Sequence, residues 1–203
     1  MFWFGKNKTP ITGQKILIVS DIHFELSPKE RKVFDQEFDQ VWVLGDIPRE
    51  ILALVNKMKC PKVGVLGNHD VHTSFDGFDI INLHGTAAEI NGLCIAGIEG
   101  SSKYKSSPYV MLSQHDSKKV ADHLPSADIL LTHDSMYHVH DEATNKEGLQ
   151  GITNYIDKHH PLLHVYGHHH EHTQYKHGKT TCICNYRLGI IETNGLYYQQ
   201  NNN

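Results

Sequence analysis

Short apolar runs alternate with amphipathic segments along the first third of the chain. The runs at 15–20, 41–46 and 62–70 are rich in apolar, mostly β-branched residues, which is typical of strands buried on both faces. Between them, 27–38 begins with a capping box and 49–59 carries apolar residues at helical spacing, so both are predicted to be helical. This alternation predicts a largely parallel sheet with helices packed on it.

The rest of the chain mixes hairpin signals with further strands and helices. Asn91-Gly92 separates two short apolar runs within 79–98 and predicts a hairpin, and the tail predicts an antiparallel hairpin series around His177-Gly178. The segment 199–203 is expected to be frayed. Two more helices and two more strands are predicted over 113–124 and 148–159, and over 127–134 and 162–170, respectively.

Five predicted strands end directly in polar residues of the metal-ligand or acid–base type. The stretches read VSDIH, VLGDI, VLGNHD, LLTHD and VYGHHH. Because ligands bind beyond the carboxyl ends of strands in open α/β sheets, these residues are expected at one rim. Mixed oxygen and imidazole donors suit Mn, Fe, Zn or Ni, and seven donors are about right for two ions. The seven are Asp21, His23, Asp46, Asn68, His133, His168 and His170.

Asn68, His69 and Asp70 follow the third predicted strand without a gap. Asn68 offers a ligand oxygen. His69 lies one step further on and is expected to face the substrate, where an imidazole can protonate a leaving oxygen. Asp70 is expected to hold the His69 ring in one tautomer. One turn would therefore supply a ligand, a proton donor and a residue that orients the donor.

Composition and charge narrow the class of protein. The 203 residues are 39% hydrophobic and 21% charged, which argues against disorder. The net charge is −4 and Lys and Arg form no run, so no extended nucleic-acid track is expected. No segment suits a membrane span or a signal peptide, and a cytoplasmic protein is expected. Residues 1–203 are expected to form one domain, with the extreme N-terminus and 199–203 peripheral.

Together the five stretches resemble the calcineurin-like metallophosphoesterase superfamily. The family pattern is D-x-H, G-D, G-N-H-D/E, H and G-H-x-H, and this chain matches each block in order between Asp21 and His170. The chain length and the stretch that ends in VYGHHH are similar to the small single-domain phosphoesterases. The resemblance implies an α/β fold, the αββα sandwich, in which two mixed β-sheets are flanked by helices.

The resemblance also implies a role for each residue of the site. One metal would be held by Asp21, His23, Asp46 and His170, and a second by Asp46, Asn68, His133 and His168, with Asp46 bridging. His69 would be the proton donor and Asp70 its partner, and the metals would be Mn, Fe or Zn. Two residues are expected to contact the substrate: Arg49, near the bridging Asp46, and His138, in the loop after His133.

The function favoured by this reading is a dinuclear metal-dependent phosphoesterase that uses metal-activated water. Phosphodiesters are favoured over monoesters, and the substrate is expected to be a small phosphate ester or a nucleotide. The alternatives are a phosphomonoesterase, including a Ser/Thr protein phosphatase-like activity, and a catalytically silent metal-binding scaffold. A metal store in the histidine-rich tract 159–177 is a further alternative. It predicts metal uptake that does not depend on Asp21, Asp46 or Asn68.

Overall fold

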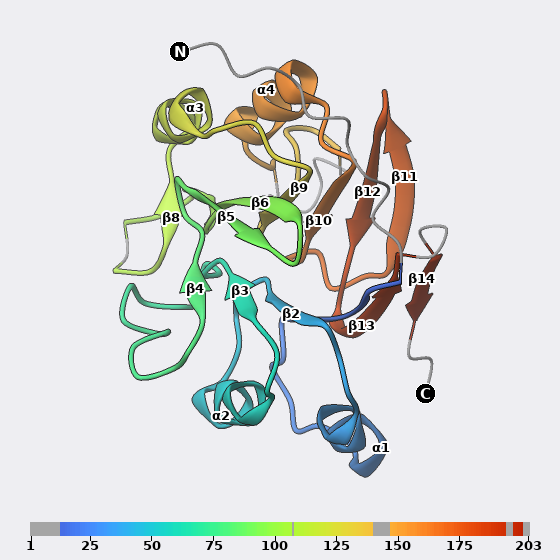
Figure 1. Ribbon diagram of the computed structural model, residues 1–203. Coiled ribbons are helices and arrows are strands. Elements are labelled where there is room, and N and C mark those ends of the chain that lie inside the picture. Colours follow the sequence, from blue (N-terminus) through green and yellow to red (C-terminus); the bar gives the residue numbers. More distant parts are fainter. Residues whose placement is uncertain (1–12, 107, 140–146, 194–196, 201–203) are drawn as a thin grey trace.

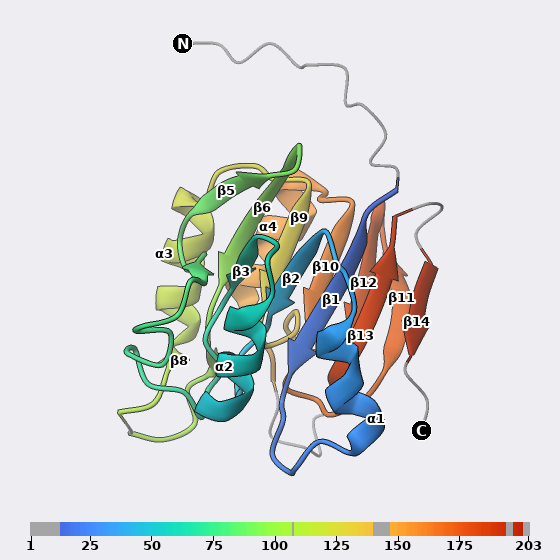
Figure 2. The same ribbon diagram turned by 60° about the horizontal axis from the view of Figure 1, so that its bottom comes forward.

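Two mixed β-sheets pack face to face, and helices cover their outer faces (Figure 1). The computed structural model describes residues 13–106, 108–139, 147–193 and 197–200. The predicted αββα sandwich is confirmed within these residues, and Figure 2 shows the layers from a second direction. The division into one domain stays a prediction, and residues 1–12 and 201–203 lie outside the described part.

The first sheet has six strands in the order β14-β13-β1-β2-β3-β4. The adjacent strands β1, β2, β3 and β4 run parallel to one another. On the other side of β1, β13 pairs antiparallel with β1, and β14 pairs antiparallel with β13. The strands are β1 (Lys15–Ser20), β2 (Gln40–Val43), β3 (Lys62–Gly64), β4 (Ile81–Asn82), β13 (Arg187–Glu192) and β14 (Tyr197–Gln200). The parallel centre therefore points the carboxyl ends of β1, β2 and β3 to one edge of the sheet.

The second sheet also has six strands, in the order β11-β12-β10-β9-β6-β5. Its centre is parallel and its two outer pairs are antiparallel. The strands are β5 (Ala87–Ile90), β6 (Leu93–Ile98), β9 (Ile129–Thr132), β10 (Leu163–Tyr166), β11 (Thr173–His177) and β12 (Thr180–Cys184). A separate small pair joins β7 (Ser101–Ser102) to β8 (Met111–Leu112).

Three hydrophobic cores hold the four layers together. Alternate residues of β1 belong to different cores: Ile18 lies between the sheets, whereas Val19 faces the helices of the first sheet. Trp42 is fully buried between the sheets, and Tyr155 is buried between the second sheet and its helices. The helices are α1 (Pro28–Arg31), which continues into the 3-10 turn η1 (Lys32–Asp35), α2 (Arg49–Lys57), α3 (Gln114–His123) and α4 (Gln150–His159). None of the described helices is long and apolar enough to cross a membrane.

The elements differ from the sequence prediction mainly at their ends. The helix expected over 27–38 is one α-turn followed by the 3-10 turn, although the predicted capping box is present at Ser27. Each strand that leads to the rim ends before its polar residues, because the backbone turns away there: β2 ends at Val43 and β3 at Gly64. The hairpin around Asn91-Gly92 is confirmed.

The tail is not one hairpin series. The hairpin around His177-Gly178 is present, but β12 also pairs parallel with β10, and the chain then crosses to the first sheet, where β13 pairs with β1. The hydrophobic period cannot reveal this crossing, because both sheets bury strands on two faces. The frayed end expected over 199–203 was wrong for Gln199 and Gln200, which pair with β13.

Arg187 fastens the segment that follows β1. Its guanidinium donates to both carboxylate oxygens of Glu30, at 2.7 and 3.1 Å, and to the backbone carbonyl of Glu25 at 3.1 Å. It also donates to the carbonyl of Phe24, which directly follows His23. The start of β13 therefore holds in place the segment that presents His23.

We expect the Glu30–Arg187 pair to stabilise the fold in a pH-dependent way. The hydrogen bond from Arg187 lowers the pKa of Glu30 from 4.5 to about 2, so its stabilisation is complete above about pH 4.5 and is lost as the pH falls towards 2. Glu30→Gln should lower the free energy of unfolding by about 1 kcal/mol at pH 7, measured by urea denaturation. That difference should shrink below pH 4.5.

The matched control is Glu37→Gln, because Glu37 is exposed. It should leave the free energy of unfolding unchanged at every pH. A deficit of Glu30→Gln that is the same at pH 2 and pH 7 would contradict the assignment.

Candidate metal centre

The seven predicted ligand residues lie where the carboxyl ends of five strands meet. Asp21, Asp46 and Asn68 follow β1, β2 and β3 of the first sheet, whereas His133 and His168 follow β9 and β10 of the second. Two hydrogen bonds to or from the backbone join the two sheets here: the His168 N–H donates to Asp21 Oδ2 at 2.9 Å, and His133 Nδ1 donates to the Leu44 carbonyl at 2.7 Å. The expectation of one shared rim is met, and the rim is built from two sheets.

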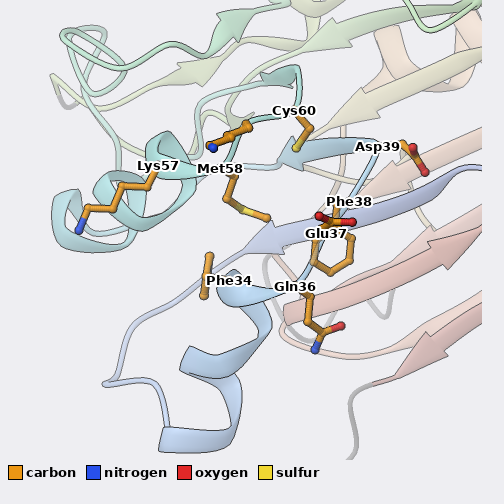
Figure 3. A pocket seen from close by; sticks show the side chains of 9 residues that line it. Phe34, Gln36, Glu37, Phe38, Asp39, Lys57, Met58 and Cys60 are labelled. Carbon is orange, nitrogen blue, oxygen red and sulfur yellow. The ribbon is translucent and has the colours of Figure 1, made fainter.

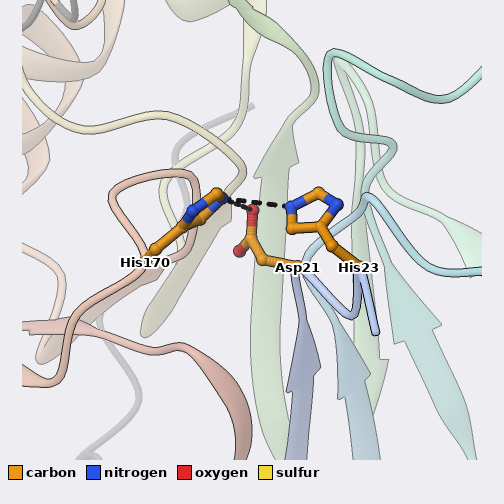
Figure 4. Close-up of side chains that lie close together, drawn as sticks. All are labelled: Asp21, His23 and His170. Atoms are coloured by element: carbon orange, nitrogen blue, oxygen red, sulfur yellow. Dashed lines mark hydrogen bonds and ion pairs between the residues drawn. The ribbon is translucent and has the colours of Figure 1, made fainter. Parts of the chain in front are cut away.

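The first group of donors consists of Asp21, His23 and His170 (Figure 4). His23 Nε2 and His170 Nε2 are 3.1 Å apart, and His170 Nε2 is 3.5 Å from Asp21 Oδ1. Asp21 is fully buried, whereas both histidines are exposed. The group therefore has the buried carboxylate of Asp21 on one side and the two exposed imidazoles, which form its accessible imidazole side, on the other.

The second group consists of Asp21, Asp46 and His133, all buried. His133 Nε2 lies 3.6 Å from Asp46 Oδ2 and 2.9 Å from Asn68 Oδ1. The His168 ring centroid is 5.0 Å from that of His133. All seven residues are thus brought together, and Asp21 is the carboxylate that belongs to both groups of three.

Left-handed backbone places several of these side chains. Asp21, Asp46, His168 and His170 have φ of 49°, 54°, 66° and 56°, values that are uncommon for non-glycine residues and that cluster at functional sites. Two glycines leave room for the carboxylates: a Cβ on Gly67 would overlap Asp46 Oδ1, and a Cβ on Gly167 would overlap Asp21 Oδ2. Left-handed backbone turns and glycines without a Cβ therefore allow the donors to approach one another.

The donors converge in a way that suits cations. His133 Nδ1 must carry a proton to bond the Leu44 carbonyl, so whenever the ring is neutral its Nε2 points a lone pair at Asn68 Oδ1. Asp21 Oδ1 is buried and accepts no hydrogen bond from the described residues. Unpaired lone pairs that face one another are costly, and a bound metal ion satisfies them together. The residues present therefore fit a metal centre of nitrogen and oxygen donors.

The two buried carboxylates also favour positive charge electrostatically. Burial would lower the pKa of His133, yet the charges of Asp46 and Asp21 raise it above its ordinary value. Burial would raise the pKa of Asp21, but its contact with His170 and the charge of His133 lower it. Both directions mean that a cation is favoured between the sheets at this edge.

His69 and Asp70 are positioned by the same turn but make different contacts. The His69 N–H donates to Asp46 Oδ1 at 2.8 Å, and its exposed ring lies 6.0 Å from the ring of His23. Asp70 Oδ2 accepts from the backbone N–H groups of Asp46 and Gly67, at 2.9 and 2.8 Å, and burial raises the pKa of Asp70 to about 6. Asp70 thus fixes the backbone that carries Asp46, and its action on the His69 ring stays a prediction.

The two expected substrate contacts lie on different elements, because Arg49 is the first residue of α2 and His138 lies in the loop after β9. The Arg49 guanidinium donates to the Asp76 carbonyl at 3.2 Å and lies 4.7 Å from the Phe78 ring centroid. His138 is exposed, with its ring 3.9 Å from that of Tyr137. Neither residue contacts the seven donors through these interactions, and their roles in substrate binding stay predictions. His140 lies outside the described residues.

A buried network behind His168 was not apparent from the sequence. His169 turns inwards, with Nε2 3.1 Å from Ser135 Oγ and 3.5 Å from Asp134 Oδ1. Asp134 is fully buried and accepts from the Ser102 N–H at 2.9 Å; although burial opposes it, the neighbouring His168 and His169 lower its pKa. Alternation along the strand end predicts that the His169 side chain points away from those of His168 and His170. That it meets Asp134 depends on β9 lying next to β10, which the sequence does not reveal.

The described cavity lies away from these residues. A cavity of about 540 Å³ is found beside the amino ends of β2 and β3, next to α2 and η1 (Figure 3). Phe34, Phe38 and Met58 supply apolar walls, and Asp39 and Lys57 supply charge. Because β1, β2 and β3 are parallel, this cavity and the metal centre are at opposite ends of the strands.

Comparisons with known proteins agree with this geometry. Residues 15–185 match the family model of the calcineurin-like phosphoesterase superfamily domain. Among solved structures, a protein of Thermus thermophilus is similar with a TM-score of 0.67 at 15% identity, covering 93% of this chain and 99% of that chain. The phosphopantetheinyl hydrolase of Mycobacterium tuberculosis is similar with a TM-score of 0.63 at 11% identity, covering 87% and 91%.

A third similar structure is an archaeal phosphodiesterase, with a TM-score of 0.53 at 17% identity, covering 91% of this chain and 97% of that chain. At these identities the structural likeness establishes the fold. No curated protein matches the sequence.

We expect Asp21→Asn to weaken binding of Mn²⁺ by at least about tenfold, measured by calorimetry. The amide can still accept from the His168 N–H through its oxygen, but it places an NH₂ group where the buried Oδ1 now lies. The matched control is Asp157→Asn in α4, because the Asp157 carboxylate pairs at 2.7 Å with His177 of the histidine-rich tract. If Asp157→Asn weakens binding and Asp21→Asn does not, metal storage in 159–177 is the correct reading.

Gly67→Ala should reduce both Mn²⁺ affinity and stability, because the added methyl group would occupy the position of Asp46 Oδ1. We expect a destabilisation of about 3 kcal/mol, in line with overpacking of a tight site. Gly178→Ala is the control: its Cβ meets open space, so its left-handed φ alone should cost about 1 kcal/mol, with Mn²⁺ affinity unchanged. Equal Mn²⁺ affinities in the two variants would show that Gly67 does not shape the centre.

Proposed function

The chain belongs to the calcineurin-like phosphoesterase superfamily, and we propose that it hydrolyses phosphate esters with two bound metal ions, preferring phosphodiesters. The proposed ions are Mn, Fe or Zn, in line with the mixed nitrogen and oxygen donors. The observation that carries the proposal is that seven donors from five strand ends converge, with the buried carboxylates of Asp21 and Asp46 among them. Retention of the complete donor set favours an enzyme over a silent scaffold.

The proposed ligand sets follow the sequence interpretation. Asp21, His23, Asp46 and His170 would hold one ion, and Asp46, Asn68, His133 and His168 the other. Support is partial: Asp21, His23 and His170 of the first set form one group of three donors, and Asp46 and His133 of the second set lie in the other. Asp21 belongs to both groups, whereas the proposed sets share Asp46. When bound, such ions supply positive charge to the phosphoryl oxygens and acidify a water molecule.

The role proposed for His69 is to donate a proton to the leaving oxygen. Its ring is exposed and lies 6.0 Å from His23, so a phosphate ester at the centre would be within its reach. The bond from its N–H to Asp46 Oδ1 fixes the distance between this residue and the metal centre. Asp70 fixes the other side of the turn by accepting from Asp46 and Gly67. The hydrogen bonds of this turn would therefore hold His69, the proposed acid, at a fixed position relative to the proposed ligand Asp46.

The test is hydrolysis of diphenyl phosphate and phenyl phosphate with Mn²⁺, because the departing phenol oxygen needs a proton whereas p-nitrophenolate leaves without one. His69→Ala should lower kcat by at least about a hundredfold on both esters while Mn²⁺ still binds, because it removes only the acid. Asp46→Asn should lower both kcat and Mn²⁺ affinity. The matched control His115→Ala, on the exposed face of α3, should behave as wild type.

The ratio of diester to monoester hydrolysis decides the subclass, and a higher rate on the monoester would overturn the diester preference. Activity of His69→Ala within about twofold of wild type would remove His69 from the reaction. A folded, Mn²⁺-loaded wild type that hydrolyses neither ester would favour the scaffold.

A further inference from the structure

A tyrosine stands next to the proposed proton donor. The Tyr109 ring centroid is 6.1 Å from that of His69, with the two ring planes at 54°. Tyr109 lies two residues before β8, and 40% of its surface is exposed. His69 also contacts His23 of the metal centre. Tyr109 therefore extends the site beyond the metal donors, through the ring of His69.

A cation and a second ring accompany Tyr109. The Lys105 ammonium lies 5.8 Å from the Tyr109 ring centroid and 5.1 Å from that of Tyr104, which is 56% exposed. A cation between two rings attracts both and restricts their motion. The Lys105 ammonium thus pairs with two exposed aromatic rings, of which the Tyr109 ring stands beside His69.

Two other exposed apolar residues are next in sequence to residues of the site. Phe24 directly follows His23 and Val71 directly follows Asp70. The ring of Tyr109 lies beside that of His69 itself. An exposed aromatic ring beside a candidate active site points to a ligand with an apolar portion.

The ligand that suits these groups is a planar ring with polar edges. Exposed polar residues, Lys105 and Ser106, follow Tyr104 in the same segment, so the segment offers a polar as well as an aromatic surface and suits an acyl chain poorly. A nucleobase needs less: one aromatic face to stack on and polar surroundings for its edges. The distance also fits, because a leaving oxygen near His69 places the base of a nucleoside several ångströms further on, where Tyr109 lies.

We propose that Tyr109, steadied by Lys105, is the specificity-determining residue that stacks on the nucleobase of a nucleoside leaving group. The inference rests on the proposed function, because it takes His69 as the residue next to the leaving oxygen. It goes further by defining the alcohol portion of the ester as a nucleoside. Tyr109 takes no part in the bond-breaking step and acts on binding.

The experiment compares two non-hydrolysable probes bound to the Mn²⁺-loaded protein. One is the methyl ester of the phosphonate analogue of AMP, a diester mimic in which CH₂ replaces the ester oxygen on the ribose, and the other is the same analogue of ribose 5-phosphate. Calorimetry should show the AMP analogue binding wild type roughly tenfold more tightly, the range expected for one base stacked on an aromatic ring. Tyr109→Ala should abolish that difference and leave the affinity for the ribose analogue unchanged.

Two further variants separate stacking from other causes. Tyr109→Phe should retain the preference of about tenfold, whereas Tyr109→Leu should lose it. Leu162→Ala is the control, because Leu162 is exposed just before the amino end of β10, away from the metal centre, and it should change the preference by less than about twofold. Equal affinities of wild type for both probes, a failure of wild type to bind either, or full retention of the preference in Tyr109→Ala or Tyr109→Leu would overturn the proposal.

Hydrolysis of bis-p-nitrophenyl phosphate by the same preparations keeps the two proposals apart. Activity without a base preference refutes the role of Tyr109 alone. A base preference that depends on Tyr109 in a protein without activity upholds the recognition site and refutes the proposed hydrolysis.

Discussion

Two carboxylates buried at the junction of two sheets are the constraint on which this structure depends. Asp21 and Asp46 are almost entirely withdrawn from water, and Asp21 Oδ1 accepts no hydrogen bond within the described residues. An unpaired buried charge is expensive, so the surrounding structure must offer positive charge or a cation. The carboxylates raise the pKa of His133, which favours a positive charge on that ring, and the facing nitrogens of His23 and His170 offer lone pairs to a cation.

The fold supplies what that arrangement requires. Parallel strands at the centre of each sheet send their carboxyl ends to one edge, and the bonds from His133 to Leu44 and from His168 to Asp21 join the two edges. Left-handed backbone and glycines then let the side chains approach. The cores between the layers stabilise this geometry, because they hold the sheets together and so offset the cost of its strained turns.

The rim joins the metal donors to an aromatic surface. The ring of His69 contacts both His23 of the metal centre and Tyr109, so one exposed imidazole links the two. Arg187 holds the segment after His23 from a strand that lies at the far end of the chain. Residues widely separated in sequence therefore determine how the accessible imidazole side is presented.

The sequence alone determined the donors and their order. Each donor follows a buried apolar run, and strand ends are recognisable because an apolar period breaks abruptly into polar residues. The capping box at Ser27 and the hairpin at Asn91-Gly92 were likewise local, since their hydrogen bonds join residues close in sequence. Hydrogen bonds that form within a short stretch can therefore be predicted from the sequence of that stretch.

Only the tertiary structure decided which partners those groups meet. It assigned Asp70 to the backbone of Asp46, turned His169 towards Asp134, and moved β13 into the first sheet beside β1. It also placed Tyr109 beside His69, although nothing in the intervening sequence signals that contact. The physical reason is that burial and hydrogen bonding are satisfied by whatever lies adjacent in space, and adjacency between strands far apart in sequence is set by the packing of the two sheets.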